Sequence, residues 1–318
     1  MTQEAPLISI VTGSRLHFGL TRIKPVSVNC LNGIGVMIDA PGTKLEIRPA
    51  TKFNVVGSER LREFAKSWSV MTSNPLPDCE LSLVEHPPAH SGFGSGTQLA
   101  HSVANGLNRF CGQPVKLNAD EVSKVAENCE RGRRSMIGSY GFAKGGLIVD
   151  GIDDVGRTCL VNQVNLPSEW RVLVVVAEEA NKKFGIQEEA AFANIQAETF
   201  DPSDELEQLI SGKIVPAAKR EDFDTFAKSV FEYGKISGSY YVPVQGGIYN
   251  GPVITEIVDA LLKLGASGVG QSSWGPAVFA WCQNQTQAND LMLALPQCTR
   301  HAIKMYTSAA RNRPADIS

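Results

Sequence analysis

The sequence predicts an α+β protein of two domains. Helix-like and strand-like patterns follow one another without a fixed order along the 318 residues, and long helical stretches stand apart from the strand pairs. A domain typically holds about 150 residues, so this length suits two of them. We place the boundary in the polar stretch 163–168, which gives domains over residues 1–166 and 167–318 with functional sites between them.

Strands open the first half of the chain. Residues 6–20 alternate in a way that predicts a strand, and its period of two places Arg15 and His17 on one face. The other elements expected in this half are strands over 34–38 and 44–48, joined by a turn at 39–42, helices over 99–110 and 120–130, and a strand over 147–149.

The second half is also mixed. Apolar residues at helical spacing alternate with short apolar runs, and Gly265 is typical of the end of a helix. The elements expected here are strands over 172–177 and 299–308, helices over 187–199, 204–210, 222–235, 253–264 and 288–295, and a glycine-rich turn followed by a strand within 267–281.

Composition argues against several classes of protein. Hydrophobic residues make up 43% and charged residues 20%, which favours a packed core over disorder. The formal net charge of −3 argues against a main role in binding nucleic acid or an anionic membrane. We find no apolar run long enough for a bilayer and expect no secretory signal. Seven widely spaced cysteines without a CxxC pair indicate reduced thiols, so we expect a cytoplasmic protein.

A glycine-rich loop over residues 90–98 leads into the helix at 99–110. Glycines let the backbone approach an anion, and the free N–H groups of a helix start favour a phosphate. The loop is neither a Walker A loop nor a regular GxGxxG pattern, and a capped helix after a tight turn would produce a similar sequence. The residues expected to bind phosphate are Gly92, Gly94, Ser95, Gly96, Thr97 and Gln98.

A second segment, residues 131–140, carries three arginines close together. Guanidinium groups suit phosphate or carboxylate oxygens, although such a charge run is also typical of a solvated helix end. The loop at 90–98 resembles the phosphate loop of the GHMP kinase superfamily, which includes galactokinase, homoserine kinase and mevalonate kinase. Those kinases usually carry a catalytic aspartate in the second segment, where this chain has Gly138.

The departures from the kinases match one branch of that superfamily. Six strings are similar to the β-ribofuranosylaminobenzene 5'-phosphate synthase family, at 14–20, 33–39, 94–98, 132–135, 145–151 and 270–276. Met136 departs from the family pattern, which has a glycine after the serine. The resemblance implies a two-domain GHMP-kinase-like fold, with a ribosomal S5 domain 2-like N-terminal domain and a ferredoxin-like C-terminal domain.

The same resemblance implies an activity. That family condenses phosphoribosyl pyrophosphate with 4-aminobenzoate, or with 4-hydroxybenzoate in some members, and releases CO₂ and pyrophosphate early in tetrahydromethanopterin biosynthesis. Such a decarboxylating pentosyl transferase deprotonates no hydroxyl, so it needs no kinase-type base. The resemblance also implies Mg²⁺, which shares the charge of the leaving pyrophosphate, and a homodimer. The sequence does not identify the metal ligands; Asp39, Glu130 and Asp150 are the nearest carboxylates.

In the implied reaction, the site neutralises phosphate charge and positions two substrates. Which anionic group each arginine holds stays open. The residues expected to be catalytic are Arg15, His17, Arg133 and Arg134. Besides the loop, the residues expected to bind phosphoribosyl pyrophosphate are Arg131, Ser135, Gln271, Ser272 and Ser273.

Two other functions stay open. An ATP-dependent small-molecule kinase of the same superfamily would phosphorylate a hydroxyl group, and Gly138 weakens that interpretation. A non-catalytic member would bind neither phosphoribosyl pyrophosphate nor ATP, and it would have no physical need for the glycine and arginine strings. The choice between the two benzoates also stays open, because both present the same carboxylate and ring.

Overall fold

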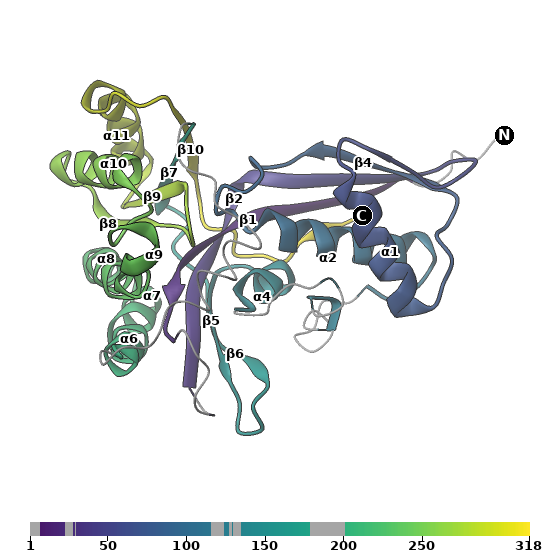
Figure 1. Ribbon diagram of the computed structural model, residues 1–318, viewed down its shortest axis with the longest axis horizontal. Coiled ribbons are helices and arrows are strands. Elements are labelled where there is room, and N and C mark those ends of the chain that lie inside the picture. The colour runs from purple at the N-terminus through teal and green to yellow at the C-terminus, as the bar shows by residue number, and fades with distance from the viewer. Residues whose placement is uncertain are drawn as a thin grey trace.

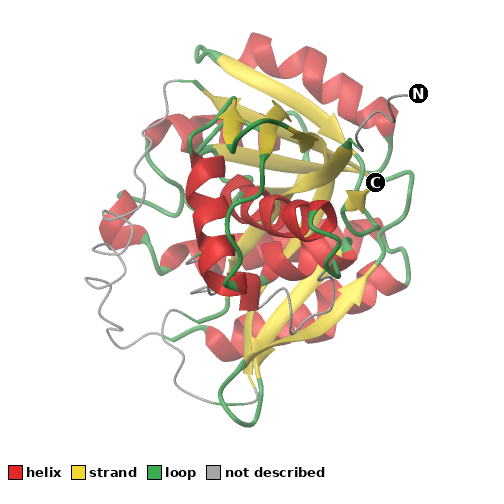
Figure 2. Cartoon of the chain, turned by 90° about the vertical axis from the view of Figure 1, so that its right-hand side faces the viewer, coloured by secondary structure: helices red, strands yellow, loops and turns green. Residues whose placement is uncertain are grey.

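A computed structural model describes residues 7–22, 28, 30–115, 124–126, 129, 135–178 and 201–318. Helices and strands are interleaved along the chain (Figures 1 and 2), and the strands form two sheets. The α+β prediction is therefore confirmed. The helix expected over 187–199 and most of the one expected over 120–130 lie outside the described residues.

The first sheet has seven strands, ordered β11-β1-β2-β4-β3, and β2 also pairs with β5, which pairs with β6. Neighbouring strands are antiparallel except β3 and β4. Helices α1 and α2 pack against each other beside this sheet (Figure 1). The elements are β1 Ile8–Leu20, β2 Cys30–Pro49, β3 Asn54–Val56, α1 Arg60–Thr72, β4 Cys79–Glu85, α2 Ser95–Phe110, α4 Ile137–Lys144, β5 Leu147–Ile152, β6 Thr158–Val164 and β11 Asp316–Ile317.

The second sheet has four antiparallel strands in the order β10-β7-β9-β8. Along the chain, helices separate β7 from β8, and helix α11 separates β9 from β10. This is the β-α-β-β-α-β order of a ferredoxin-like domain. The elements are β7 Arg171–Ala177, α6 Ser203–Gln208, a π-helical turn Leu209–Ile214, α7 Val215–Lys219, α8 Phe223–Ser239, α9 Val242–Gln245, α10 Pro252–Lys263, β8 Ser267–Gln271, β9 Ala277–Cys282, α11 Gln285–Cys298 and β10 Ile303–Ser308.

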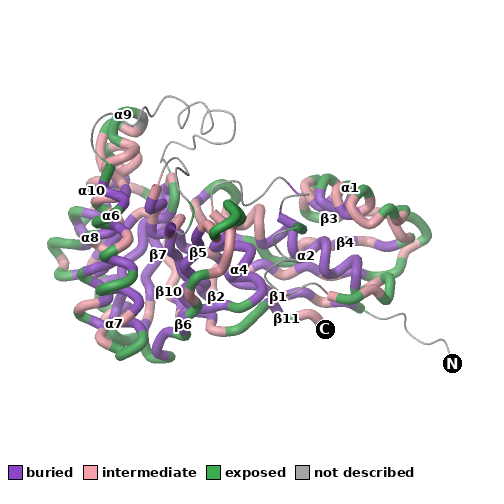
Figure 3. The backbone as a smooth tube through the Cα atoms, turned by 90° about the horizontal axis from the view of Figure 1, so that it is seen from below, coloured by how far each residue is buried: buried purple, intermediate pink, exposed green. Residues whose placement is uncertain are grey.

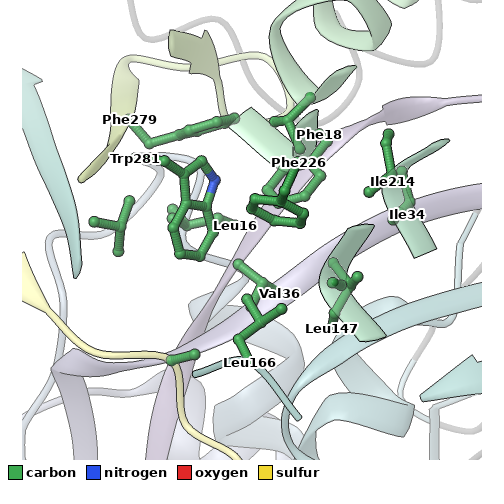
Figure 4. Packing of buried hydrophobic residues seen from close by; sticks show 14 of the residues in the cluster. Leu16, Phe18, Ile34, Val36, Leu147, Leu166, Ile214, Phe226, Phe279 and Trp281 are labelled. Atoms are coloured by element: carbon green, nitrogen blue, oxygen red, sulfur yellow. The ribbon is translucent and has the colours of Figure 1, made fainter. Parts of the chain in front are cut away.

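One hydrophobic core joins the two sheets. The rings of Phe18 on β1 and Phe279 on β9 lie 5.2 Å apart, and Phe226 on α8 lies 5.2 Å from Trp281. Figure 4 shows these four side chains packed together above Val36 of the first sheet, and Figure 3 shows buried residues along the chain between the two sheets. This shared core holds the glycine-rich loop and the β8–β9 turn in fixed relative positions.

Two local expectations differ from the structure, and some elements were not expected. The strands expected at 34–38 and 44–48 belong to one strand, β2, in which residues 39–42 bulge out of the ladder between Thr12 and Ser14 of β1. The glycine-rich segment 267–271 forms a strand, because its glycines fit closely beside Phe279 and Trp281. Several elements have no counterpart among the predicted ones: helices α1, α4, α7 and α9 and strands β3, β4, β6 and β11.

The end of the chain returns to the first sheet. Strand β11 pairs with β1, and Arg311 forms ion pairs with Asp39 and Asp316. The Leu166 N–H donates to Asn312 Oδ1 at 3.0 Å, and the Leu166 carbonyl accepts from Asn312 Nδ2 at 2.7 Å. The two connections between the sheets therefore lie side by side. The boundary between residues 166 and 167 stays a prediction. Within the described ranges, each helix is too short or too polar to cross a membrane.

Candidate anion-binding site

The glycine-rich loop leads directly into α2. Gly94 is the N-cap with a φ of 64°, a left-handed conformation that suits glycine. The N–H groups of Thr97 and Gln98 donate to its carbonyl at 3.0 and 3.2 Å, so those of Ser95 and Gly96 precede the first bond of the helix. Among the described side chains, none caps this end. The helix start thus offers backbone donors and a positive dipole end to an anion.

A pocket of about 190 Å³ adjoins this helix start. It is lined by four parts of the chain that are distant in sequence, and none of its lining residues is acidic. Two guanidinium groups and the start of a helix meet there, so the pocket favours negatively charged ligands. The lining consists of Arg15, Arg60, residues 90–97 and the turn residues Ser273, Trp274 and Gly275.

Arg15 extends from β1 towards the loop. Its backbone N–H donates to the Phe93 carbonyl at 2.8 Å, and a Cβ added at Gly94 would meet its Nε at 3.0 Å. The Nε and Nη1 atoms are buried. A guanidinium held this close to the loop adds charge-assisted donors to the backbone ones. The structure thus brings Arg15 together with loop residues 92–97.

Arg60, which sequence reasoning missed, is the first residue of α1. Its guanidinium lies 5.7 Å from the ring centre of Phe64, one turn further along that helix. The apolar spacing of Leu61, Phe64, Ala65 and Trp68 could have predicted α1. That pattern alone would not have shown that the helix begins beside the loop.

The β8–β9 turn closes the pocket from the second sheet. The Ser272 hydroxyl donates to the Gly92 carbonyl at 2.7 Å and accepts from the backbone N–H of His17 at 3.0 Å. Gln271 accepts from the Asn250 N–H and donates to the carbonyl of Ser273. Ser272 and Gln271 therefore position the loop and the turn, whereas Ser273 is exposed and lines the pocket.

Trp274 also lines the pocket. Its ring packs against Tyr241 at 4.9 Å, and its backbone carbonyl accepts from the Asn250 side chain at 2.7 Å. These contacts fix the part of the turn that faces the glycine-rich loop.

His17 is buried and outside the pocket lining. The Gly19 N–H donates to Nδ1 at 3.1 Å, so the ring proton is on Nε2, which donates to Ser135 Oγ at 3.1 Å. Burial, and next the charge of Arg15, holds the pKa of His17 well below its usual value. The structure therefore joins the neutral, buried His17 to the half-buried Ser135, and neither residue lines the pocket.

Asp150 ends this series of hydrogen bonds. Its Oδ2 accepts from the Met136 N–H and, at 3.4 Å, from the Asn32 side chain. Burial raises the pKa of Asp150 to about 7, although the hydrogen bonds from Met136, Asn32 and Ser135 act to lower it. The carboxylate thereby anchors the start of α4. Met136, the residue that departs from the family pattern, is buried at this anchor.

Gln98 is also buried. Its Oε1 accepts from Thr12 Oγ1 at 2.8 Å, and its Nε2 donates to the Gly138 carbonyl at 2.8 Å. A Cβ added at Gly138 would meet Thr97 Cγ2 at 3.3 Å. The position where the kinases carry an acid is therefore beside the glycine-rich loop, and it bears no side chain.

The remaining expected site residues, Arg131, Arg133 and Arg134, lie outside the described residues, as does Glu130. Asp39 is paired with Arg311 and Arg313, and Asp150 is held by the α4 start. Within the described ranges no cluster of acidic, histidine or cysteine side chains suits a metal ion. The described residues thus offer no carboxylate set for Mg²⁺, and Mg²⁺ stays an expectation.

Comparisons with known families place two segments of the chain. Residues 59–143 match the family described as GHMP kinases N terminal domain, and residues 214–300 match GHMP kinases C terminal. Together the two matches cover just over half of the chain. The first contains α1, the glycine-rich loop and α2, and the second contains the β8–β9 turn, so every lining residue of the pocket except Arg15 lies in a matched segment.

Two similar proteins are archaeal and carry the name beta-ribofuranosylphenol 5'-phosphate synthase. The protein of Methanothermobacter thermautotrophicus is 26% identical over 296 residues, which cover 85% of this chain and 87% of that one. The protein of Archaeoglobus fulgidus is 25% identical over 292 residues, which cover 86% and 87%.

Solved structures share the fold at low identity. Homoserine kinase from Cytophaga hutchinsonii superposes with a TM-score of 0.69 at 13% identity, covering 100% of this chain and 99% of that one. Mevalonate kinase from Methanococcus jannaschii superposes with a TM-score of 0.69 at 15% identity, covering 98% of this chain and 100% of that one. At such identities the likeness concerns the fold, and the predicted GHMP-kinase-like architecture is confirmed.

Proposed function

We propose that this chain, which belongs to the GHMP kinase superfamily, condenses phosphoribosyl pyrophosphate with 4-aminobenzoate or 4-hydroxybenzoate and releases CO₂ and pyrophosphate. The single observation that carries the proposal is the pocket. It combines a helix start, a glycine-rich loop and two guanidinium groups, and it has no acidic lining residue. Such a pocket suits a ligand rich in phosphate charge.

The proposed chemistry explains the missing acid. The bond between ribose C1 and the pyrophosphate oxygen breaks, and its electron pair leaves with pyrophosphate. The ring carbon that bears the carboxylate forms a bond to C1, and the electron pair of the carboxylate bond then returns to the ring as CO₂ departs. No proton is taken from a nucleophile, so the bare Gly138 beside Thr97 is compatible with this reaction.

The residues then have distinct roles. The N–H groups of Ser95 and Gly96 and the Arg15 guanidinium would neutralise the departing pyrophosphate. Ser272 would keep the loop in place, and Ser273 would add an exposed hydroxyl. Arg131, Arg133 and Arg134 stay predictions from the sequence for the other anionic groups.

The similar archaeal proteins also support this reaction class. Their name denotes a phenol joined to ribose 5'-phosphate, which favours 4-hydroxybenzoate as the acceptor. The proposal would place this chain at an early step of tetrahydromethanopterin biosynthesis.

The test is a turnover assay on the purified full chain with Mg²⁺, phosphoribosyl pyrophosphate and each carboxyl-labelled acid. We expect CO₂ release that requires both substrates. Arg15→Ala should lower kcat/KM for phosphoribosyl pyrophosphate by about 10- to 100-fold, because a charged hydrogen-bond donor is lost. The control is Arg48→Ala, since Arg48 is an exposed strand arginine paired with Glu46 outside the pocket.

Two results would contradict the proposal. One is the absence of CO₂ release with both acids. The other is ATP-dependent phosphorylation of a hydroxyl substrate, which would establish the kinase alternative instead.

A further inference from the structure

A second pocket of about 120 Å³ adjoins the anion pocket. Arg60 and Ser95 line both pockets, so the two cavities meet at these residues. The second pocket extends from them towards the first sheet, where Thr43 of β2 lines it. Nothing in the proposed reaction so far uses this space.

The second pocket is mainly apolar but contains one unusual hydroxyl. Leu83, Leu99 and Ala89 supply apolar atoms, whereas Thr43 is 2% exposed and its buried Oγ1 has no hydrogen-bond partner among the described residues. A buried polar atom normally has a partner, because an unpaired one costs about 1–3 kcal/mol. A ligand group in this pocket would supply the missing partner.

The strand register shows which way Thr43 points. Thr43 lies opposite Thr12 in the β1–β2 ladder, and opposed residues share a face of the sheet. The Thr12 hydroxyl bonds to Gln98 of α2, so this is the α2 face, from which Leu99 also lines the pocket. The hydroxyl is therefore on the side where the cavity lies.

The size of the second pocket suits a single aromatic ring. A cavity of roughly 150 Å³ lined by apolar side chains holds benzene, and this one is slightly smaller and joins a second space. Arg60 lines it where the two pockets meet, and Thr43, with its unpaired hydroxyl, lines it from β2. The complementary ligand is a flat ring with a carboxylate at one end and a hydrogen-bonding group opposite it.

We propose that this second pocket is the acceptor subsite of the synthase reaction. The inference rests on the proposed function for the identity of the acceptor. The carboxylate of the acid lies at Arg60, and the para amino or hydroxyl group hydrogen-bonds to Thr43. This orientation presents the carboxylate-bearing carbon to the anion pocket, where the ribose C1 of the other substrate must lie.

The proposal is tested by calorimetric binding to the full chain, with inorganic pyrophosphate filling the anion pocket so that no turnover occurs. The ligands are 4-hydroxybenzoate, 4-aminobenzoate and benzoate, which lacks the para group. We expect the wild-type chain to bind the two substituted acids about three- to tenfold more tightly than benzoate, as one hydrogen bond allows.

Paired variants separate the two ends of the pocket. Thr43→Val should abolish the preference for the para group, Thr43→Ser should retain it, and Thr51→Val, at an exposed threonine away from the pocket, should match the wild type. Arg60→Ala should weaken all three acids to a similar extent. Arg62→Ala is its control, because Arg62 pairs with Glu59 on the same helix outside both pockets.

The outcomes distinguish this inference from the proposed function. CO₂ release by the wild type, with a para preference that survives Thr43→Val, would overturn the subsite assignment alone. No CO₂ release, with a para preference that depends on Thr43, would overturn the proposed reaction and support the second pocket as a binding site for the para-substituted acids. Failure of the wild type to bind either substituted acid, or ATP binding that Thr43→Val weakens while the acids do not compete, would overturn the subsite.

Discussion

Two structural features of the site require a glycine at position 94. It holds a left-handed φ of 64° at the start of α2, and it leaves space for Arg15, whose Nε, Cβ and Cζ would lie 3.0–3.3 Å from an added Cβ. Gly112, just beyond the other end of the same helix, has a similar φ of 68° and no atom within 4 Å of such a Cβ. Substitutions at these two glycines therefore distinguish the effect of backbone strain, which both share, from the effect of crowding, which only Gly94 has.

We expect Gly94→Ala and Gly112→Ala to lose similar stability, about 1–2 kcal/mol each, because both force alanine into the left-handed region. Only Gly94→Ala should also weaken pyrophosphate binding, since it displaces Arg15. Urea denaturation and calorimetric titration with pyrophosphate would measure the two effects. Equal pyrophosphate affinity in both variants would show that the position of Arg15 does not depend on Gly94.

At the scale of elements, the site depends on the β8–β9 turn meeting the loop before α2. Ser272 makes that connection with one buried hydroxyl, which bonds to Gly92 and to His17, whereas its neighbour Ser273 is exposed. Ser272→Ala should cost about 1–3 kcal/mol of unfolding free energy, because it leaves buried backbone groups unpaired. Ser273→Ala should cost less than about 0.5 kcal/mol.

Thermal melts of the two serine variants, each compared with the wild type, would measure that difference. We expect a clearly lower Tm for Ser272→Ala alone. Equal Tm values in the two variants would show that the turn is held by its other contacts.

Some elements and site residues can be predicted from the sequence, and others cannot. The loop at 90–98, Arg15 and most helices follow from local spacing, because their signals lie within a few residues. Arg60 and Thr43 join the site only through packing of α1 and the register of β1 with β2, which no local pattern contains. The bulge at 39–42 was expected as a turn, because the same proline and glycine residues suit both.

At the scale of the whole molecule, Asp150 makes stability depend on pH. Its pKa is about 7 in the folded protein, against a model-peptide value of 3.8, because burial disfavours the charge. The folded state thus binds a proton that the unfolded chain releases. This contribution to stability is fully present below pH 3.8 and is lost as the pH rises through about 7.

Asp150→Asn removes this titration. We expect the unfolding free energy of the variant, relative to that of the wild type, to rise by about 2–3 kcal/mol between pH 5 and pH 8. Burial lowers the pKa values of His17 on β1 and His101 on α2, so the stability that each neutral histidine contributes is lost as the pH falls below 6.5. Both histidines are present in the wild type and in the variant, so these contributions cancel in the comparison. Urea denaturation at the two pH values is the measurement, and a pH-independent difference would contradict the assignment.

The paired connections at Leu166 and Asn312 have a mechanical consequence. The chain leaves the first sheet after β6 and returns to it through β11, and the two crossings are hydrogen-bonded to each other. The shared core and the Ser272 hydrogen bonds join the same two sheets at other places. Several separate attachments leave the sheets little freedom to rotate or slide, so we expect the glycine-rich loop and Trp274 to keep their spacing when a ligand binds.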